Sequence, residues 1–282
     1  MAAFSSNTTA FWEKELADGG GEWYGKSTQY WIENCPPTLD GVLGGFAAVD
    51  PVDVRESAKF LEDVAACQQR RCSDGGGAGA GEGRRPAMRR EHALDGGAGI
   101  GRVTKHLLSN FFAKVDLLEG NQRLLDHAPD FLGEKRAHLG EMFCDTLQNF
   151  APREAAYDCI WVQWVVIYLT DVDFIRFLAR CARGLRQGGL IFIKENVLDK
   201  DSTNDLVKDE DDSSVTRSLA LMEHIFAEAG LEIVLKRHQQ DWADNMLPVM
   251  MYALAPRRSS STDEEAKPGA AGGGGDERRR RR

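Results

Sequence analysis

Three glycines recur at alternate positions behind an acidic residue, in the segment Asp95-Gly96-Gly97-Ala98-Gly99-Ile100-Gly101. An apolar run at 92–94 precedes the segment, and a helical pattern of apolar residues at 102–112 follows it. A strand, a glycine turn and a helix let the backbone approach a nucleotide-like ligand closely, because a Cβ at the turn would block that approach. Glycine-rich turns also occur without a ligand, so the segment alone leaves both interpretations open.

The spacing of these glycines narrows the class of ligand. G-x-G-x-G differs from the pyrophosphate-binding G-x-G-x-x-G, and the chain has no G-x-x-x-x-G-K-[ST] triphosphate loop. Glu119 ends the next apolar segment, about 20 residues after the turn. A carboxylate there can accept hydrogen bonds from both ribose hydroxyls of an adenosine ligand, although a solvated loop acid is the alternative. The turn resembles that of S-adenosylmethionine (AdoMet) enzymes of the Rossmann-like class.

A regular alternation of strands and helices must position these residues. Apolar patterns predict strands at 92–96, 115–119, 139–144, 157–164 and 190–196, and helices at 102–112, 121–130, 171–186 and 214–229. Two more strands, 231–237 and 248–254, follow without a helix between them. The order predicts an α/β fold with a mostly parallel sheet and an antiparallel closing hairpin. Ligands bind such sheets at the carboxyl ends of the strands, which gathers Gly97, Glu119, Asp145, Trp164 and Asn196 near one crevice.

Other segments flank this AdoMet-binding domain, which is predicted to span 91–256. Residues 1–72 are predicted to be an N-terminal helical segment, with helices around 8–17 and 53–66 joined by a stretch suited to form a lid. Residues 73–90 are rich in glycine and too poor in apolar groups to offset the entropy of ordering, which predicts a disordered insertion. Residues 257–282 are predicted to be a disordered tail that ends in five arginines. Such a run is a nuclear import signal, a nucleic-acid contact or simply a solvated tail.

Composition bounds the remaining possibilities. A chain of 282 residues with 42% hydrophobic residues suits one domain with appendages, and a net charge of −9 argues against general nucleic-acid binding but accommodates a cationic substrate. The absence of a membrane-length apolar run or a signal peptide favours a cytosolic or nuclear location. The six cysteines lack metal-ligand spacing, so no metal site is predicted. Cys144, Cys159 and Cys181 lie in apolar patterns and are expected to be reduced core thiols.

Polar residues gather at three more places. Gln163 and Trp164 end the fourth predicted strand, and Asn196 ends the fifth. The acidic run at 209–212 precedes Ser213, where it either caps a following helix or holds a cationic substrate.

Several blocks of the chain, taken in order, resemble the alpha-N-terminal protein methyltransferases, which methylate the N-terminal amine of proteins that begin Xaa-Pro-Lys after removal of the initiator methionine. The blocks are Tyr30-Trp31, 36–45, 94–102, 157–164 with 169–171, 193–196 and 212–215. The resemblance covers roughly residues 22–255, apart from the insertion. It implies a Rossmann-like class I AdoMet-dependent methyltransferase with a seven-stranded sheet and an N-terminal helical lid. The implied cofactor is AdoMet, and the implied partners are proteins with a free Xaa-Pro-Lys N-terminus.

The resemblance also implies which residues form the site. The AdoMet-binding residues would be Gly97, Gly99, Arg102, Glu119, Leu147, Gln148, Gln163 and Trp31. Trp164 would stack on the substrate proline and Asn196 would bond the peptide backbone. Asp209, Asp212 and Ser214 would surround the amine and the third-position lysine, while Leu43 and Gly44 would line the channel. The catalytic residues would be Asp212, Asn196 and Tyr168.

The expected chemistry requires a neutral amine. An α-amine has a pKa of about 7.7–8.0, so a carboxylate that binds its cationic form must also accept its proton, and Asp212 is the candidate acceptor. The family usually has a histidine where this chain has Tyr168, and tyrosine, with a pKa near 10, is a poor base at neutral pH. The family also has an aromatic-containing peptide clamp where this chain has Met246, Leu247 and Pro248.

Two alternative functions remain at this stage. One is a small-molecule amine methyltransferase on the same fold. The other is a non-catalytic adaptor that keeps the AdoMet pocket and binds protein N-termini. Tyr168, in place of the family histidine, is the feature that favours this alternative.

Overall fold

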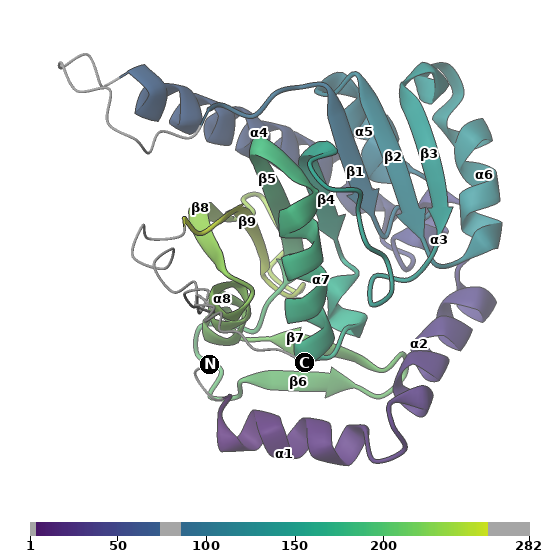
Figure 1. Cartoon of the computed structure of the whole chain (residues 1–282). Helices are drawn as coiled ribbons and strands as arrows, with labels where there is room; N and C mark the ends of the chain where they lie inside the picture. The colour runs from purple at the N-terminus through teal and green to yellow at the C-terminus, as the bar shows by residue number, and fades with distance from the viewer. Residues whose placement is uncertain (1–3, 74–85, 259–282) are drawn as a thin grey trace, which may run out of the picture.

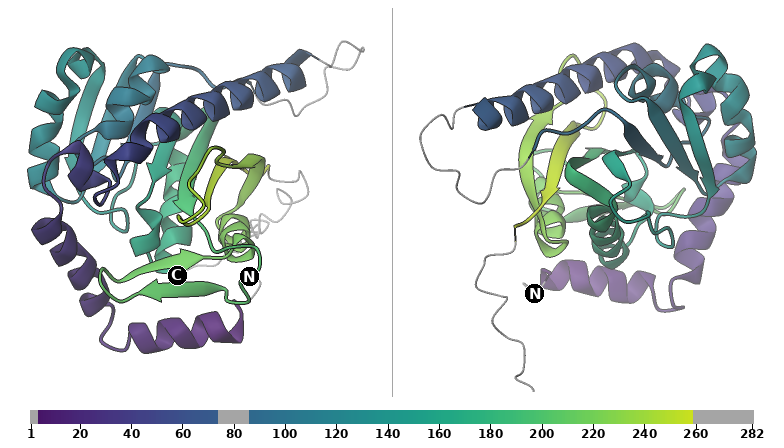
Figure 2. Two further views of the ribbon diagram at one scale, coloured as in Figure 1. Left: turned by 180° about the vertical axis from the view of Figure 1, so that it is seen from behind. Right: turned by 45° about the horizontal axis from the view of Figure 1, so that its top comes forward.

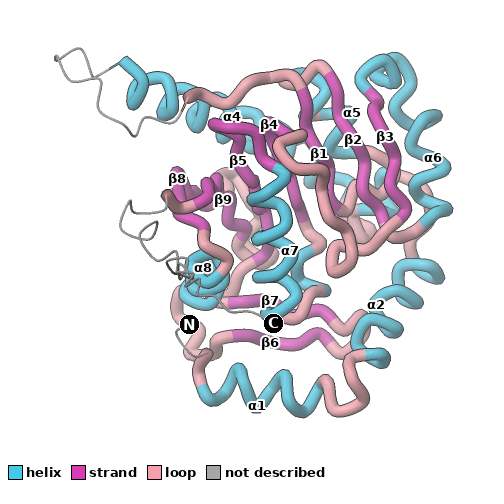
Figure 3. The backbone as a smooth tube through the Cα atoms, viewed as in Figure 1, coloured by secondary structure: helices cyan, strands magenta, loops and turns pink. Residues whose placement is uncertain are grey.

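A seven-stranded sheet forms the centre of the protein in the computed structural model, which describes residues 4–73 and 86–258 (Figures 1 and 3). Its order is β3-β2-β1-β4-β5-β9-β8. The strands are β1 His92–Gly96, β2 Lys114–Glu119, β3 Leu139–Cys144, β4 Tyr157–Gln163, β5 Leu185–Asn196, β8 Leu231–His238 and β9 Val249–Pro256. Strands β1 to β5 are parallel, and β9 runs antiparallel to both β5 and β8. The predicted α/β class and closing hairpin are therefore confirmed.

Helices cover both faces of the sheet (Figure 2). One face carries α4 Asp50–Ser73, α5 Arg102–His106 and α6 Gln122–Leu132, and the other carries α7 Asp171–Gly184 and α8 Leu219–Glu228. Helix α7 buries Phe174, Phe177 and Leu178, which lie on one face because they are three and four residues apart. The predicted helix 102–112 is split, since α5 ends at His106 and a 3₁₀ turn, η2 Leu108–Asn110, follows. The other 3₁₀ turns are η1 Ala47–Val49, η3 Gly133–His138 and η4 Val166–Tyr168.

The chain between β5 and α8 forms a separate antiparallel hairpin of β6 Leu206–Asp209 and β7 Ser214–Arg217. The helix predicted at 214–229 is therefore wrong in its first part, and so is the helix-capping role considered for the acidic run. The N-cap of α8 is Ser218, whose side chain accepts a hydrogen bond from the Leu221 amide. The segment 214–217 forms a strand and not a helix because Val215 packs against tryptophans of the N-terminal helices and Arg217 donates to buried acceptors.

Three N-terminal helices form an arm along the hairpin and the sheet: α1 Ser6–Glu15, α2 Gly21–Asn34 and α3 Leu39–Val42. Figure 1 shows α1 lying beneath β6 and β7. Trp12 on α1 donates from Nε1 to Asp171 Oδ2 over 2.8 Å, and Lys208 Nζ on β6 lies 2.7 Å from Glu15 Oε2. Helix α1 begins before the predicted 8–17, α4 is longer than the predicted 53–66, and α2 was not predicted as a helix.

Some expectations concern the flanks and the cysteines. Residues 74–85 of the predicted insertion and the tail from 259 lie outside the described residues, whereas residues 86–90 lead into β1, with the Met88 amide donating to Gln68 Oε1. Cys159 and Cys181 are buried as expected, but Cys144 is exposed at the end of the edge strand β3. No helix in the described ranges is long and apolar enough to cross a membrane. Those ranges also contain no group of three or more His, Cys, Asp or Glu side chains placed to hold a metal ion.

Candidate active site

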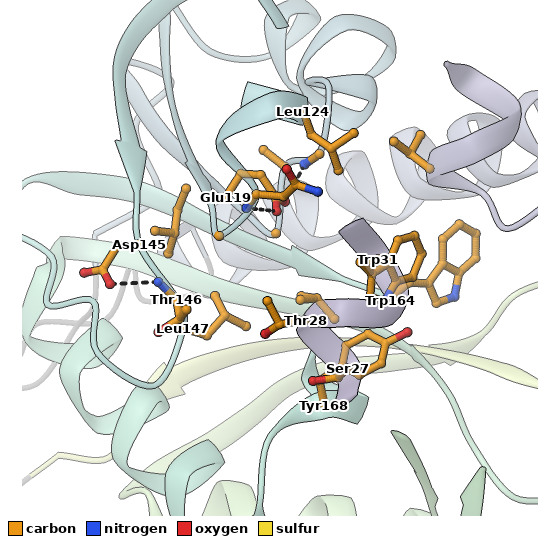
Figure 4. A pocket seen from close by; sticks show the side chains of 18 of the residues that line it. Ser27, Thr28, Trp31, Glu119, Leu124, Asp145, Thr146, Leu147, Trp164 and Tyr168 are labelled. Carbon is orange, nitrogen blue, oxygen red and sulfur yellow. Dashed lines mark hydrogen bonds between the residues drawn. The ribbon is translucent and has the colours of Figure 1, made fainter. Parts of the chain in front are cut away.

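A cavity of about 220 Å³ opens at the carboxyl ends of β1, β2 and β4, where the strand order reverses (Figure 4). Its walls come from the glycine turn after β1 with the start of α5, the ends of β2 and β3, the turn after β4, and helix α2, together with single residues of α3 and α6. Ten predicted site residues line it, namely Trp31, Gly97, Gly99, Arg102, Glu119, Leu147, Gln148, Gln163, Trp164 and Tyr168.

The glycine turn is shaped by close contacts that exclude side chains. Gly97 has φ +75°, and a Cβ there would lie 2.7 Å from Val165 Cγ1. Gly99 has φ +56°, and a Cβ there would lie 3.2 Å from Val42 Cγ1 on α3. Asp95, before the turn, accepts hydrogen bonds from the amide and hydroxyl of Thr104, which ties the start of α5 to β1. Complete burial raises the pKa of Asp95 to about 6.

Glu119 closes one side of the cavity. Its Oε2 accepts from the Gly99 amide over 2.9 Å, and its Oε1 accepts from the Asn121 amide over 2.8 Å. These bonds fix both carboxylate oxygens and leave lone pairs that a pair of hydroxyls can use. Burial raises the pKa of Glu119, although the two amides act in the opposite direction.

Several buried polar atoms in the wall have no hydrogen-bond partner among the described residues. They include Asn121 Nδ2, Thr146 Oγ1 and Trp164 Nε1. Buried polar groups are nearly always satisfied in folded proteins, so their placement indicates a polar ligand or water in the cavity. The loop with Thr146, Leu147 and Gln148 is held firmly, because Arg180 on α7 donates to the carbonyls of Leu147 and Gln148.

Arg102 and Gln163 line the cavity but are also bound to helix α4. Arg102 Nη1 lies 2.8 Å from Asp50 Oδ1 and 2.7 Å from Asp53 Oδ2. Gln163 Nε2 donates to Asp53 Oδ1 over 2.8 Å, and Lys194 Nζ lies 2.5 Å from the same oxygen. Burial lowers the pKa of Lys194, and Asp53 partly restores it. The buried Gln163 side chain at the end of β4 thus belongs to a network of buried charged groups beneath the cavity, centred on Asp53.

Aromatic rings close the side of the cavity that faces α2. Trp31 on α2 meets the ring of Tyr168 edge to face, with centroids 6.0 Å apart. The backbone of the Tyr168 turn is fixed from the same helix, because Trp23 Nε1 donates to the Tyr168 carbonyl over 2.8 Å. Figure 4 shows Trp31, Trp164 and Tyr168 together on this side, opposite Glu119. Helix α2 therefore covers this side of the cavity, and it shares only its last turn, from Tyr30 onward, with the connecting stretch that the sequence suggested as a lid.

Tyr168 connects the cavity to the acidic turn of the β6–β7 hairpin. Its hydroxyl donates to Asp212 Oδ2 over 2.8 Å, while Asp212 Oδ1 accepts from the Ser214 amide over 3.1 Å. Burial and the neighbouring Asp212 carboxylate raise the pKa of Tyr168 well above its usual value, so its hydroxyl is a neutral donor at neutral pH.

Arg217 holds this turn and the hairpin together. It is buried, and it donates from Nε to Asp171 Oδ1 over 2.7 Å and from Nη1 to the Val166 carbonyl over 3.1 Å. Since Arg217 belongs to β7 and its side chain bonds to η4 Val166–Tyr168, it fixes the position of Tyr168 relative to the hairpin that carries Asp212.

Six other predicted site residues lie outside the cavity wall, namely Leu43, Gly44, Asn196, Asp209, Asp212 and Ser214. Asp212 reaches the wall through Tyr168, and Asp209 and Ser214 face each other across the hairpin. Asn196 ends β5 beside buried Glu195, and burial raises the pKa of Glu195 to about 8. Their roles toward a substrate remain predictions.

Sequence reasoning missed the contribution of α2 beyond Trp31. Tyr24, Ser27 and Thr28 line the cavity, as do Asn121 and Thr146 from the loops after β2 and β3. Tyr24 Oη donates to Asp173 over 2.6 Å, and the Thr170 amide donates to Tyr24 Oη. The available signal was the spacing of Tyr24, Ser27, Thr28 and Trp31, at intervals of three or four residues that place them on one helical face.

The chain is similar to known methyltransferases in both sequence and structure. A family described as AdoMet dependent proline di-methyltransferase matches residues 20–255. The chain is 39% identical over 240 residues to the N-terminal Xaa-Pro-Lys N-methyltransferase 1-A of Xenopus laevis, covering 85% of this chain and 98% of that protein. It is 37% identical to the alpha N-terminal protein methyltransferase 1 of Caenorhabditis elegans, covering 85% and 93%. Among solved structures, a SAM-dependent methyltransferase of Leishmania major is 35% identical with a TM-score of 0.73, covering 88% of this chain and 90% of that one.

Proposed function

Because this chain belongs to the family of AdoMet-dependent proline di-methyltransferases, we propose that it methylates the N-terminal α-amine of proteins that begin Xaa-Pro-Lys once the initiator methionine is removed. The observation that carries this proposal is the contact between cavity and hairpin: Tyr168, in the cavity wall, donates to Asp212 on an acidic turn. The cavity that would hold the methyl donor and the acidic turn that would hold the cationic amine are therefore neighbours.

The residues that line the cavity are of the types that bind AdoMet. The glycine turn lines the cavity with backbone, the Glu119 carboxylate would bind the ribose hydroxyls, and Leu147 and Gln148 would flank the adenine. The unpartnered Asn121 and Thr146 atoms supply further polar contacts. AdoMet supplies an electrophilic methyl group on a sulfonium. The residues of this chain orient that group and keep the cavity closed with Trp31.

The acidic hairpin turn suits the α-amine of the substrate. Asp212 is held by Tyr168 and the Ser214 amide. It would bind the ammonium form of the amine and accept its proton, after which the neutral nitrogen could attack the methyl group. The rate gain comes mainly from alignment of amine and methyl. Tyr168 keeps its own proton, so it orients Asp212 and does not replace the family histidine as a base.

Selection among N-termini follows from the neighbouring side chains. Trp164 offers a flat apolar surface for a proline at the second position. Asp209 is exposed on the hairpin, where it favours a cation at the third position. Leu43 and Gly44 directly follow α3 at the end of the arm, where a small first residue would pass.

Mass spectrometry of methylated peptides tests the proposal. Purified protein with AdoMet is incubated with a Ser-Pro-Lys peptide, the same peptide N-acetylated, and a Ser-Pro-Glu peptide. We expect stepwise additions of one methyl group on the free Ser-Pro-Lys peptide, little on Ser-Pro-Glu and none on the acetylated peptide. Methylation of a free small-molecule amine in preference to the peptide, or peptide binding without turnover, would refute the proposal.

A further inference from the structure

The loop between β8 and β9, residues 239–248, brings a second tryptophan against Trp164. The ring centroids of Trp164 and Trp242 are 6.2 Å apart and the ring planes are tilted by 32°. Trp242 Nε1 donates to the Leu247 carbonyl over 3.0 Å, within the same loop. The indole is therefore held in place by its own loop while part of it stays exposed to solvent.

Trp164 itself is immobilised, so the pair forms a fixed surface. Its backbone has φ +52°, a conformation that non-glycine residues rarely adopt, and its amide donates to the Lys194 carbonyl over 3.1 Å. The Arg102 guanidinium lies 5.4 Å from its ring and Lys194 Nζ lies 6.0 Å away. Contacts with Arg102, Lys194 and Trp242 therefore hold the Trp164 ring in a defined orientation.

The same loop carries acidic groups at its surface. Asp241 and Asp244 are exposed, and Asp241 Oδ2 is paired with Arg55 over 2.8 Å. Met246, Leu247 and Pro248, the positions where an aromatic clamp was expected, contain no aromatic residue. The aromatic side chain of this loop that contacts Trp164 is Trp242, several residues earlier in the chain.

The separation of the two rings matches the repeat of an extended peptide. An extended chain rises about 3.3 Å per residue, and alternate side chains point to the same side, so residues two apart are about 6.6 Å apart. A peptide whose second residue contacts Trp164 would thus present its fourth side chain toward Trp242.

We infer that Trp242 is a specificity-determining residue that receives the fourth side chain of the substrate peptide and favours an apolar or guanidinium group there. The inference rests on the proposed function. A flat indole is suited to aliphatic or guanidinium groups, and exposed Asp244 disfavours an acidic side chain at the same position.

Steady-state kinetics on Ser-Pro-Lys-Xaa peptides, with Arg, Leu, Gly or Asp as the fourth residue, tests this inference. For the wild-type protein we expect kcat/KM to be about five- to tenfold higher for Arg and Leu than for Gly, and lowest for Asp. Trp242→Ala should bring Arg, Leu and Gly to within twofold, through a higher KM at unchanged kcat. Trp242→Phe should restore most of the preference.

Controls separate this role from a structural one. The AdoMet Kd of Trp242→Ala, measured by calorimetry, should equal that of the wild type. Met142→Ala removes a large exposed apolar side chain from β3, at the opposite edge of the sheet, and should keep the wild-type preference. If the wild type methylates these peptides without a preference at the fourth position, or if Trp242→Ala keeps it, the inference is overturned and the proposed function stands. If the wild type methylates none of them, both are overturned.

Discussion

The hydrogen bond between Tyr168 and Asp212 provides a sharp test of the proposed chemistry through the substitution Tyr168→Phe. The change removes one hydroxyl and keeps the ring, so the edge-to-face contact with Trp31 and the shape of the cavity wall are retained. The backbone bond from Trp23 to the Tyr168 carbonyl is also unaffected. What is lost is the 2.8 Å bond that orients Asp212 Oδ2.

The size of the effect follows from the type of bond. A hydrogen bond to a charged group is worth about 1.5–3 kcal/mol. If the orientation of Asp212 matters only when the amine is aligned for attack, that loss raises the barrier by the same amount. At about 1.4 kcal/mol per factor of ten, kcat should fall about 10- to 150-fold.

The assay is the initial rate of methylation of a Ser-Pro-Lys peptide at saturating AdoMet, with the AdoMet Kd measured separately. Tyr157→Phe is the matched control, because Tyr157 Oη donates to Asp116 Oδ2 over 2.9 Å in a buried pair at the opposite end of β4. We expect this control to lose stability and to keep kcat. A Tyr168→Phe protein with wild-type kcat would show that the pair takes no part in the reaction.

Three further substitutions address the cofactor site, the buried acid and the buried arginine. Glu119→Gln weakens the carboxylate expected to bind ribose, so the AdoMet Kd measured by calorimetry should rise about 10- to 150-fold, and an unchanged Kd would contradict that role. Burial raises the pKa of Glu195 from its usual 4.5 to about 8, so the native state holds a proton that the unfolded chain has released and stability falls as pH rises between these values. Glu195→Gln should flatten the fall in unfolding free energy between pH 5.5 and 7.5 by at most about 1.4 kcal/mol per pH unit, as measured by urea denaturation, and an equally steep fall would contradict the assignment. Arg217→Met leaves the Asp171 carboxylate buried without its cation, so the same denaturation assay should show a loss of about 3–5 kcal/mol; a loss below about 1 kcal/mol would count against it.

The features that the sequence predicted correctly depend on residues close together in the chain. The turn that contains Gly97 and Gly99 and the acid at Glu119 are set by two neighbouring strands and one helix. A short pattern of apolar, acidic and glycine residues is therefore sufficient to place them. The alternation of strands and helices specifies the parallel sheet for the same reason, since each βα unit buries its own apolar face.

The features that were wrong or missed depend on distant partners. Strand β7 contains Arg217, which resembles a surface residue in sequence and is buried only because Asp171 and the Val166 carbonyl accept its hydrogen bonds. Helix α2 has glycines at Gly21 and Gly25, which weaken its helical pattern, and it is stabilised by packing of Trp23 against α1 and the hairpin. No pattern within a short segment reports such contacts.

The docking of α1 on the β6–β7 hairpin has a consequence for the order in which the protein is built. Ser5 and Asp205, which share a hydrogen bond, are separated by 200 residues, and Glu15 and Lys208 by 193. The cavity wall, in contrast, comes from residues between Tyr24 and Leu169. During synthesis, the elements that surround the cavity leave the ribosome before the hairpin exists, and α1 must wait for it. Since contacts between segments so far apart in the chain form slowly, we expect the elements around the cofactor cavity to fold before α1 docks on the hairpin.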